Sequence, residues 1–335
     1  MEETLRELEE AMAAHRRALA ESSARQQVQS SAVKRDVAAI DERQAALQRL
    51  AADIERVSGI EITGMMEAKL GRVLASVNLA ALDAWVSQLH LLPPDHPEWL
   101  SLIETLTVHE TFFHRDRAQL ELLAAILPEI IARAARPGRW CLRLWSAGCA
   151  TGEEAYTLAI LALLALRDAG FAEETLDGGI VCRPPWQLEV LGTDISRLVL
   201  TQAQAAVYST EGLSAFRDLP RPLQRFFPLL PRGGDMSDAE VRGVHPAVRK
   251  HVTFGHFNLM AGVPPQTRFD VVLCRNVLIY LTAAARVAAQ TVLTQALRPG
   301  GYLLLGPTDA LAEPAVYKTR WGTGALAYAL KRRHA

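Results

Sequence analysis

The segment from Leu142 to Ala159 constrains the fold of this chain more than any other stretch of its sequence. An apolar run, Leu142-Arg-Leu-Trp145, is followed by the small-residue loop Gly148-Cys-Ala-Thr-Gly152 and then by a helix-forming run that begins at Glu153. Glycine permits the tight turn and the close backbone approach that such a loop requires. We therefore predict a buried strand, a ligand-binding loop and a helix, in that order.

The residues of this loop indicate which ligand it accepts. In an open parallel sheet such a junction lies at the carboxyl ends of the strands, where nucleotide-like ligands bind. The dinucleotide fingerprint has three glycines that admit a pyrophosphate, whereas here Gly148 and Gly152 are followed by Glu153 and Glu154. Two carboxylates suit the N-terminus of a helix but repel a phosphate. S-adenosylmethionine, an adenosine ligand with an amine and no phosphate, fits better, and a nicotinamide oxidoreductase is disfavoured.

Composition indicates a soluble globular protein. The chain has 335 residues, 50% of them hydrophobic, and a net charge of −1, so no global charge favours nucleic acid or an anionic membrane. No apolar run approaches the roughly 18 to 20 residues of a membrane span. The four cysteines lack metal-ligand spacing, so we expect buried reduced thiols, no metal site and a cytoplasmic location. They are Cys141, Cys149, Cys182 and Cys274.

Residues 1–57 contain no glycine or proline and favour a long amphipathic or coiled-coil helix. Apolar side chains recur at seven-residue spacing, and only Gln26 interrupts them. The matching d positions of the heptad are mostly polar in the middle of the segment, which argues against a continuous two-stranded coiled coil. We expect the stripe to be covered, either by the same protein or through self-association or partner docking. Its members are Leu5, Met12, Leu19, Val33, Ile40, Leu47 and Ile54.

Two further domains are predicted. Residues 58–122 form a small helical domain, which includes a helix from Pro97 to Leu106 and an irregular segment, 106–116, that lies over a site. In residues 123–335 strands alternate with helices, which predicts a doubly wound α/β sheet. We expect a surface loop over 168–185 and an insertion over about 208–250 that forms a small β subdomain. The first strand is expected to begin at Leu142 and to include Leu144 and Trp145, and the others are expected at 187–195, 251–254, 269–276 and 301–306, with helices at 153–166, 196–207 and 282–297.

Several polar residues follow the predicted strands. Asp194 is placed to accept hydrogen bonds from ribose hydroxyls, with a helix cap as the alternative. Glu154 is placed to meet an amine of the ligand, with simple compensation of the helix dipole as the alternative. Asn258 and Leu259 follow the third strand, where they reach an adenine edge or form a solvated turn.

The fourth strand ends in Cys274-Arg-Asn-Val-Leu-Ile-Tyr280. A charged Arg275 beside Asn276 is costly to bury without partners, so a role in a site is favoured. Tyr280 faces the same crevice if the chain turns helical after Asn276, and otherwise is a core aromatic with a solvated hydroxyl.

Four stretches resemble the chemotaxis receptor glutamate methyltransferase family (CheR). They are Thr107-Val-His-Glu-Thr-Phe-Phe-His-Arg-Asp116, Leu144-Trp-Ser-Ala-Gly-Cys-Ala-Thr-Gly-Glu-Glu-Ala-Tyr156, Gly192-Thr-Asp-Ile195 and Phe269-Asp-Val-Val-Leu-Cys-Arg-Asn-Val-Leu-Ile-Tyr280. The resemblance covers about residues 58–330. It implies an S-adenosylmethionine-binding domain that is preceded in the chain by a small helical domain and carries an inserted β subdomain. It also implies that Arg115 and Tyr280 lie beside the reacting centre. By position, it assigns cofactor contacts to His109, Thr111, Arg115, Glu154, Asp194, Asn258, Leu259, Arg275 and Asn276.

The function that the resemblance implies is S-adenosylmethionine-dependent O-methylation of protein glutamates on a chemoreceptor or receptor-like partner. The alternative is a cofactor-binding scaffold of the same fold with weak or no catalysis, which docks partners through its N-terminal helix. The sequence departs from the family at four places. His109 replaces the usual Asn, His114 replaces an aromatic, Ala155 replaces Pro, and Pro307-Thr-Asp309 replaces a His-Ser-Glu type ending.

Overall fold

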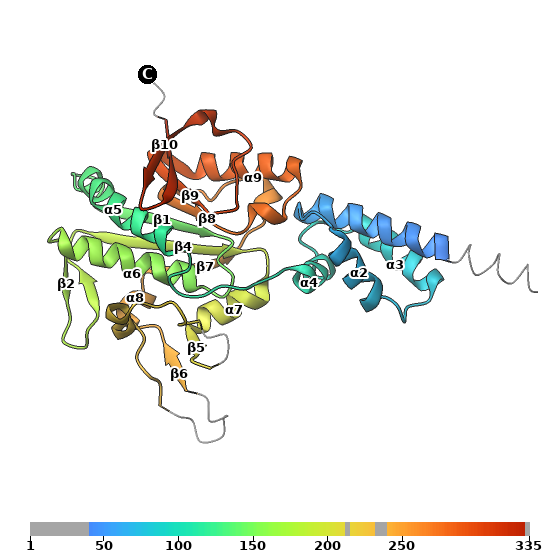
Figure 1. The fold of residues 1–335 in the computed structure, drawn as a ribbon, viewed down its shortest axis with the longest axis horizontal. Coiled ribbons are helices and arrows are strands. Elements are labelled where there is room, and N and C mark those ends of the chain that lie inside the picture. The colour runs from blue at the N-terminus through green and yellow to red at the C-terminus, as the bar shows by residue number, and fades with distance from the viewer. Residues whose placement is uncertain (1–39, 212–214, 232–239, 332–335) are drawn as a thin grey trace, which may run out of the picture. The chain divides into compact units, whose positions relative to one another are not determined.

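The structure is a computed structural model that describes residues 40–211, 215–231 and 240–331 (Figure 1). The chain divides into two compact units. The smaller unit holds the described residues up to Asp53 together with Ile62–Leu92, and the larger unit holds Ile54–Glu61 together with the chain from Pro93. The domain boundaries expected from the sequence remain a prediction.

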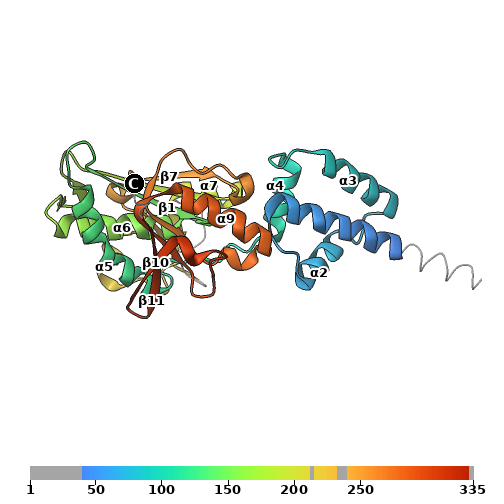
Figure 2. The same ribbon diagram turned by 90° about the horizontal axis from the view of Figure 1, so that it is seen from above.

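The smaller unit is helical. Residues 40–58 are helical, and up to Asp53 this helix runs beside α2 (Gly64–Val73) and α3 (Leu79–Leu91) (Figure 2). Ala46 and Leu50 are fully buried, and Arg43 donates hydrogen bonds to the carbonyl oxygens of Leu74 and Val77. Of the stripe members that are described, Ile54 is fully buried, Leu47 is half-buried and Ile40 is 63% exposed, so the same chain covers this part of the stripe only in part. Its members Leu5, Met12, Leu19 and Val33 lie outside the described residues.

The larger unit contains a seven-stranded sheet with the strand order β10-β11-β9-β8-β1-β4-β7. The neighbouring strands β9, β8, β1, β4 and β7 pair in parallel. At the other end of the sheet, β11 is antiparallel to both of its neighbours, β9 and β10. The five parallel strands confirm the doubly wound sheet predicted from the sequence. The strands are β1 (Cys141–Ala147), β4 (Gln187–Asp194), β7 (Val252–His256), β8 (Phe269–Cys274), β9 (Leu297–Leu305), β10 (Tyr317–Gly322) and β11 (Ala325–Leu330).

Helices cover both faces of this sheet. Right-handed crossovers place α6 (Glu153–Asp168) and α7 (Arg197–Ala205), which lead outward from β1, on one face. The same rule places α9 (Ala283–Ala296), which leads from β8 to β9 in the other direction, on the opposite face. Two more helices, α4 (Pro97–Leu106) and α5 (Arg117–Ala134), precede β1. Because β1, β4 and β8 run parallel to one another, their carboxyl ends share one edge of the sheet.

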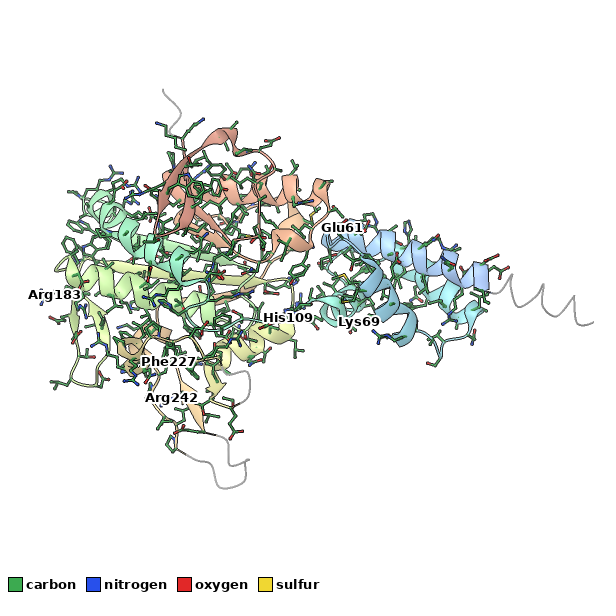
Figure 3. The ribbon with its side chains drawn as sticks, viewed as in Figure 1. Glu61, Lys69, His109, Arg183, Phe227 and Arg242 are labelled. Atoms are coloured by element: carbon green, nitrogen blue, oxygen red, sulfur yellow. The ribbon has the colours of Figure 1, made fainter. Side chains whose placement is uncertain are left out.

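Two small hairpins branch from this core. The predicted surface loop over 168–185 is wrong in part, because β2 (Ala172–Glu174) and β3 (Ile180–Cys182) pair there as an antiparallel hairpin. In the insertion, β5 (Val207–Ser209) pairs with β6 (Val241–Gly243), as predicted, and the 3-10 helix η1 (Arg221–Phe226) and α8 (Pro246–Arg249) flank that pair. The rings of Phe113, Phe216 and Phe227 pack against one another at centroid distances of 4.3 to 5.2 Å. Phe227 is labelled in Figure 3.

Within the described ranges, no helix has the length and apolar character needed to cross a membrane. The same residues contain no cluster of His, Cys, Asp and Glu side chains that could hold a metal ion. The four cysteines are free, and Cys182 is the least buried of them.

Candidate cofactor site

The loop Gly148–Gly152 connects β1 to α6 at the shared carboxyl edge. Its first two amides, Gly148 N and Cys149 N, donate to Thr193 O of β4 at 2.7 and 2.9 Å. Gly148 has a φ of +85°, and a Cβ there would lie 2.4 Å from Val277 Cγ2. Glycine is therefore required, because this loop lies directly against the segment that follows β8. Burial raises the pKa of the Cys149 thiol well above its usual range, so the thiol stays protonated and does not act as a nucleophile.

Asp194 ends β4 and is buried beside this loop. Its Oδ2 accepts a hydrogen bond from Ala150 N at 2.9 Å, and its Oδ1 accepts one from Ser196 N at 3.0 Å. The helix-cap alternative is wrong, since the N-cap of α7 is Ser196, whose Oγ accepts from Val199 N. A carboxylate accepts about four hydrogen bonds. Asp194 therefore keeps acceptor capacity for two hydroxyl groups of a ribose.

Glu154 and Arg275 form a buried ion pair. Arg275 Nε donates to Glu154 Oε2 at 2.6 Å, and the two side chains are only 3% and 10% exposed. Ser146 Oγ donates to the other oxygen, Glu154 Oε1, at 2.6 Å. The sequence reasoning missed Ser146, although a lone hydroxyl in the apolar strand β1 was a visible signal. This network joins the carboxyl ends of β1 and β8 to the first turn of α6.

Arg275 also fixes the segment that precedes α5. Its Nη1 donates to Arg115 O at 2.7 Å and lies 3.5 Å from Asp116 Oδ2. The half-buried Arg115 side chain donates to Glu110 O at 2.7 Å and lies over the ring of Phe112. The backbone of Arg115 is thus tied to the strand ends while its guanidinium keeps donors for another group.

Two predicted contacts lie earlier on the same segment, between α4 and α5. The ring of His109 (Figure 3) is held by Thr107, with 2.7 Å between His109 Nε2 and Thr107 Oγ1. Thr111 is half-buried. The structure places both residues on the irregular segment that leads to Arg115.

Asn258 follows β7 and is engaged by its own chain. Its Oδ1 accepts from Met260 N at 2.9 Å, and its Nδ2 donates to Val57 O at 2.9 Å. It thereby caps the 3-10 helix η2 (Leu259–Ala261), in which Leu259 is half-buried. The amide keeps one N–H donor and one lone pair on its oxygen, so a contact between Asn258 or Leu259 and an adenine edge stays a prediction.

The segment after β8 carries Asn276, which has a φ of +57°, and then the 3-10 helix η3 (Leu278–Tyr280). Tyr280 is 37% exposed, so the core-aromatic alternative for it is wrong. The strand-like piece Gly59–Glu61 holds this segment, since Glu61 N donates to Tyr280 O and Thr282 N donates to Gly59 O, at 2.8 and 2.9 Å. The sequence reasoning missed this contact, because backbone pairing leaves no local pattern of side chains.

The predicted residues therefore fall into connected groups. Glu154, Arg275 and the Arg115 backbone are in direct contact, and Asp194 adjoins the glycine loop. Asn276 and Tyr280 share the segment that lies against Gly148. A buried carboxylate with free acceptor capacity beside a glycine loop fits the ribose of an adenosine ligand.

Comparisons with known proteins agree with this geometry. A family model described as "CheR methyltransferase, SAM binding domain" matches residues 109–323. The chain is 30% identical over 267 residues to chemotaxis protein methyltransferase 1 of Pseudomonas aeruginosa, covering 77% of this chain and 87% of that protein. It is 28% identical over 249 residues to chemotaxis protein methyltransferase Cher2 of Pseudomonas putida, covering 74% and 82% of the two chains.

A third relative is an uncharacterized 104.1 kDa protein of Rhodobacter capsulatus, which is 37% identical over 229 residues. The match covers 68% of this chain and only 21% of that larger protein. The residues matched by the family model include the glycine loop and the carboxyl ends of β1, β4 and β8. The chain belongs to the CheR methyltransferase family, and it is an S-adenosylmethionine-dependent methyltransferase.

Proposed function

We propose that this methyltransferase forms methyl esters on glutamate side chains of a chemoreceptor or a receptor-like signalling protein. The observation that carries the proposal is the edge formed by β1, β4 and β8, where Asp194, the Glu154–Arg275 pair and Arg115 lie on contiguous segments. The names of the chemotaxis relatives support the choice of substrate.

The proposed binding roles follow from charge. Asp194 accepts from the ribose hydroxyls, and the Glu154–Arg275 pair faces the amino-acid end of the cofactor, whose amine and carboxylate match the two charges. Thr111, His109, Asn276 and Leu259 complete the walls of the site. When bound, S-adenosylmethionine supplies an electrophilic methyl group that a carboxylate oxygen attacks, leaving S-adenosylhomocysteine.

The reaction requires no general base. A glutamate side chain has a pKa of about 4.3 and is already ionised at neutral pH. The protein therefore has to align the carboxylate and exclude water. We propose that the guanidinium of Arg115 holds the substrate carboxylate by charge-assisted hydrogen bonds and that the Tyr280 hydroxyl orients it.

The proposal is tested by assaying base-labile methyl transfer to receptor-containing membranes, with S-adenosylhomocysteine titrated calorimetrically in parallel. Transfer together with binding supports the proposal. Cofactor binding without transfer to any receptor tested would support a scaffold of the same fold instead.

Replacing Asp194 with alanine is expected to weaken S-adenosylhomocysteine binding by about 1 to 3 kcal/mol, because two ribose hydroxyls lose their acceptor. Isothermal titration calorimetry measures the change. Asp177→Ala is the matched control, since Asp177 is an exposed aspartate outside the site. Unchanged affinity in a folded Asp194→Ala protein would contradict the ribose assignment.

Replacing Arg115 with alanine is expected to lower turnover by about ten- to a hundredfold, the value of a charge-assisted hydrogen bond. Tyr280→Phe should lower it by about tenfold, the low end of the same range, since it removes a single hydrogen bond to the carboxylate. Cofactor affinity should change less than turnover in both variants. Steady-state methylation and calorimetry on the same samples separate the two quantities, with the exposed Arg136→Ala as control. Equal losses in both would mean that these residues only bind the cofactor.

A further inference from the structure

The carboxylate of Asp309 is surrounded by backbone N–H donors. Its Oδ2 accepts from Asn276 N at 2.5 Å and from Gly306 N at 3.0 Å, and its Oδ1 accepts from Ile279 N at 3.1 Å. The backbone of Leu278 also donates to it. One side chain thus satisfies amides on two separate segments, the end of β9 and the stretch that follows β8.

The stretch from Arg275 to Tyr280, which we name the β8 loop, needs such a partner. It lies between the end of β8 and α9, and its only regular structure is the short helix η3. Asn276 adopts a left-handed conformation, which is unfavourable for a residue with a side chain and persists only where the surroundings fix it. Buried amides without ladder partners need other acceptors. An ionised carboxylate is a stronger acceptor for them than a neutral group.

The close approach of the two segments is built into the backbone. A Cβ at Gly306 would lie 2.7 Å from Asp309 Oδ2 and 2.8 Å from Asn276 N, so a side chain there would displace the carboxylate. Gly148 makes the equivalent close approach to Val277 from the other side. The β8 loop is therefore enclosed between the end of β9 and the glycine loop after β1. Asp309 supplies the hydrogen-bond acceptors that join the two segments.

We propose that Asp309 is a positioning residue for methyl transfer, whose carboxylate holds the β8 loop and thereby places Arg275, Asn276 and Tyr280. Asp309 touches neither cofactor nor substrate in this role and acts through the backbone amides that it accepts from. The inference rests on the proposed function for its turnover measurement alone. Its effects on loop order and cofactor affinity are independent of which protein is methylated.

The test compares Asp309→Ala, Asp309→Asn and Asp309→Glu in the full-length chain. Asparagine keeps the shape but places an NH2 group against N–H donors, whereas glutamate keeps the charge and both acceptor oxygens. We expect Ala and Asn to lower turnover by about ten- to a hundredfold, since small misplacements of reacting groups have effects of that size. Glutamate should restore most of the turnover. Thr308→Ala, which changes the exposed neighbour in the same turn, should behave as the wild type.

A second measurement separates positioning from general stability. Hydrogen exchange followed by mass spectrometry should show faster exchange in peptides covering residues 275–281 in the Ala and Asn variants, with unchanged exchange in β1 and β4. S-adenosylhomocysteine affinity should fall several-fold in the same variants and recover with glutamate.

Three results would overturn the inference. They are unchanged exchange at residues 275–281 in Asp309→Ala, wild-type turnover and affinity in Asp309→Asn, or failure of glutamate to restore what alanine removes. Absence of methyl transfer by the wild-type protein would instead count against the proposed substrate, and exchange and cofactor affinity would still decide the role of Asp309.

Discussion

Replacing Glu154 with alanine is expected to lower the free energy of unfolding of the larger unit by about 3 to 5 kcal/mol, because it leaves Arg275 charged and buried without its main partner. The Arg275 side chain is 3% exposed, so water cannot replace the lost carboxylate without opening the site. Chemical denaturation followed by tryptophan fluorescence, to which the buried Trp145 and Trp99 contribute, measures the loss.

A surface pair of the same sheet provides the control. Arg143 and Glu189 form an ion pair with an Nε to Oε2 distance of 2.6 Å, but the two side chains are 27% and 48% exposed. The Arg143 guanidinium lowers the pKa of the Glu189 carboxyl. Solvent screening reduces the value of such a pair, so Glu189→Ala should cost no more than about 1 kcal/mol.

A double-mutant cycle completes the experiment. Removing Glu154 and Arg275 together should cost less than the sum of the two single changes, because no buried charge is then left unpaired. Additive losses, or a loss from Glu154→Ala as small as that from Glu189→Ala, would show that the buried pair does not hold the strand ends together.

The sequence predicted the parallel part of the sheet because its central strands are short segments rich in apolar residues that alternate with helix-forming runs. All six residues of β8 are buried, for example, and such runs are typical of strands covered on both faces. It did not predict β10 and β11. In β10 only Tyr317 is buried, and Trp321 is 72% exposed, so the edge strand lacks the apolar signal of the others. The turn at Thr323 and Gly324, both with positive φ, was the available clue.

The candidate site was predicted unevenly for a similar reason. Residues that follow a strand, such as Asp194 and Arg275, are recognisable because polar groups stand out after an apolar run. Their partners are not, since Asp309 and Gly59 act on backbone groups 30 or more residues away in the chain. A single sequence shows where charged groups occur, but pairing between distant backbones leaves no periodicity to read.

Two truncations should give different results at the N-terminus. Removing residues 1–57 takes away Ala46, Leu50 and Ile54, each fully buried, and also Val57, whose carbonyl oxygen accepts from Asn258 Nδ2. Loss of a single large buried side chain costs about 2 to 5 kcal/mol. We therefore expect this truncation to unfold the smaller unit and to weaken S-adenosylhomocysteine binding through the Asn258 turn. Circular dichroism and calorimetry measure both effects.

Removing only residues 1–39 leaves these contacts in place, so helix content per residue from 40 onward and cofactor affinity should match the full chain. The shorter truncation also removes the part of the apolar stripe formed by Leu5, Met12, Leu19 and Val33, so it tests the role of that part alone. If that part mediates self-association, sedimentation should show a dimer for the full chain and a monomer after removal of residues 1–39. A full chain that sediments as a monomer would contradict self-association.

Wild-type cofactor affinity after removal of residues 1–57 would show that Val57 and the helix before it do not support the cofactor site.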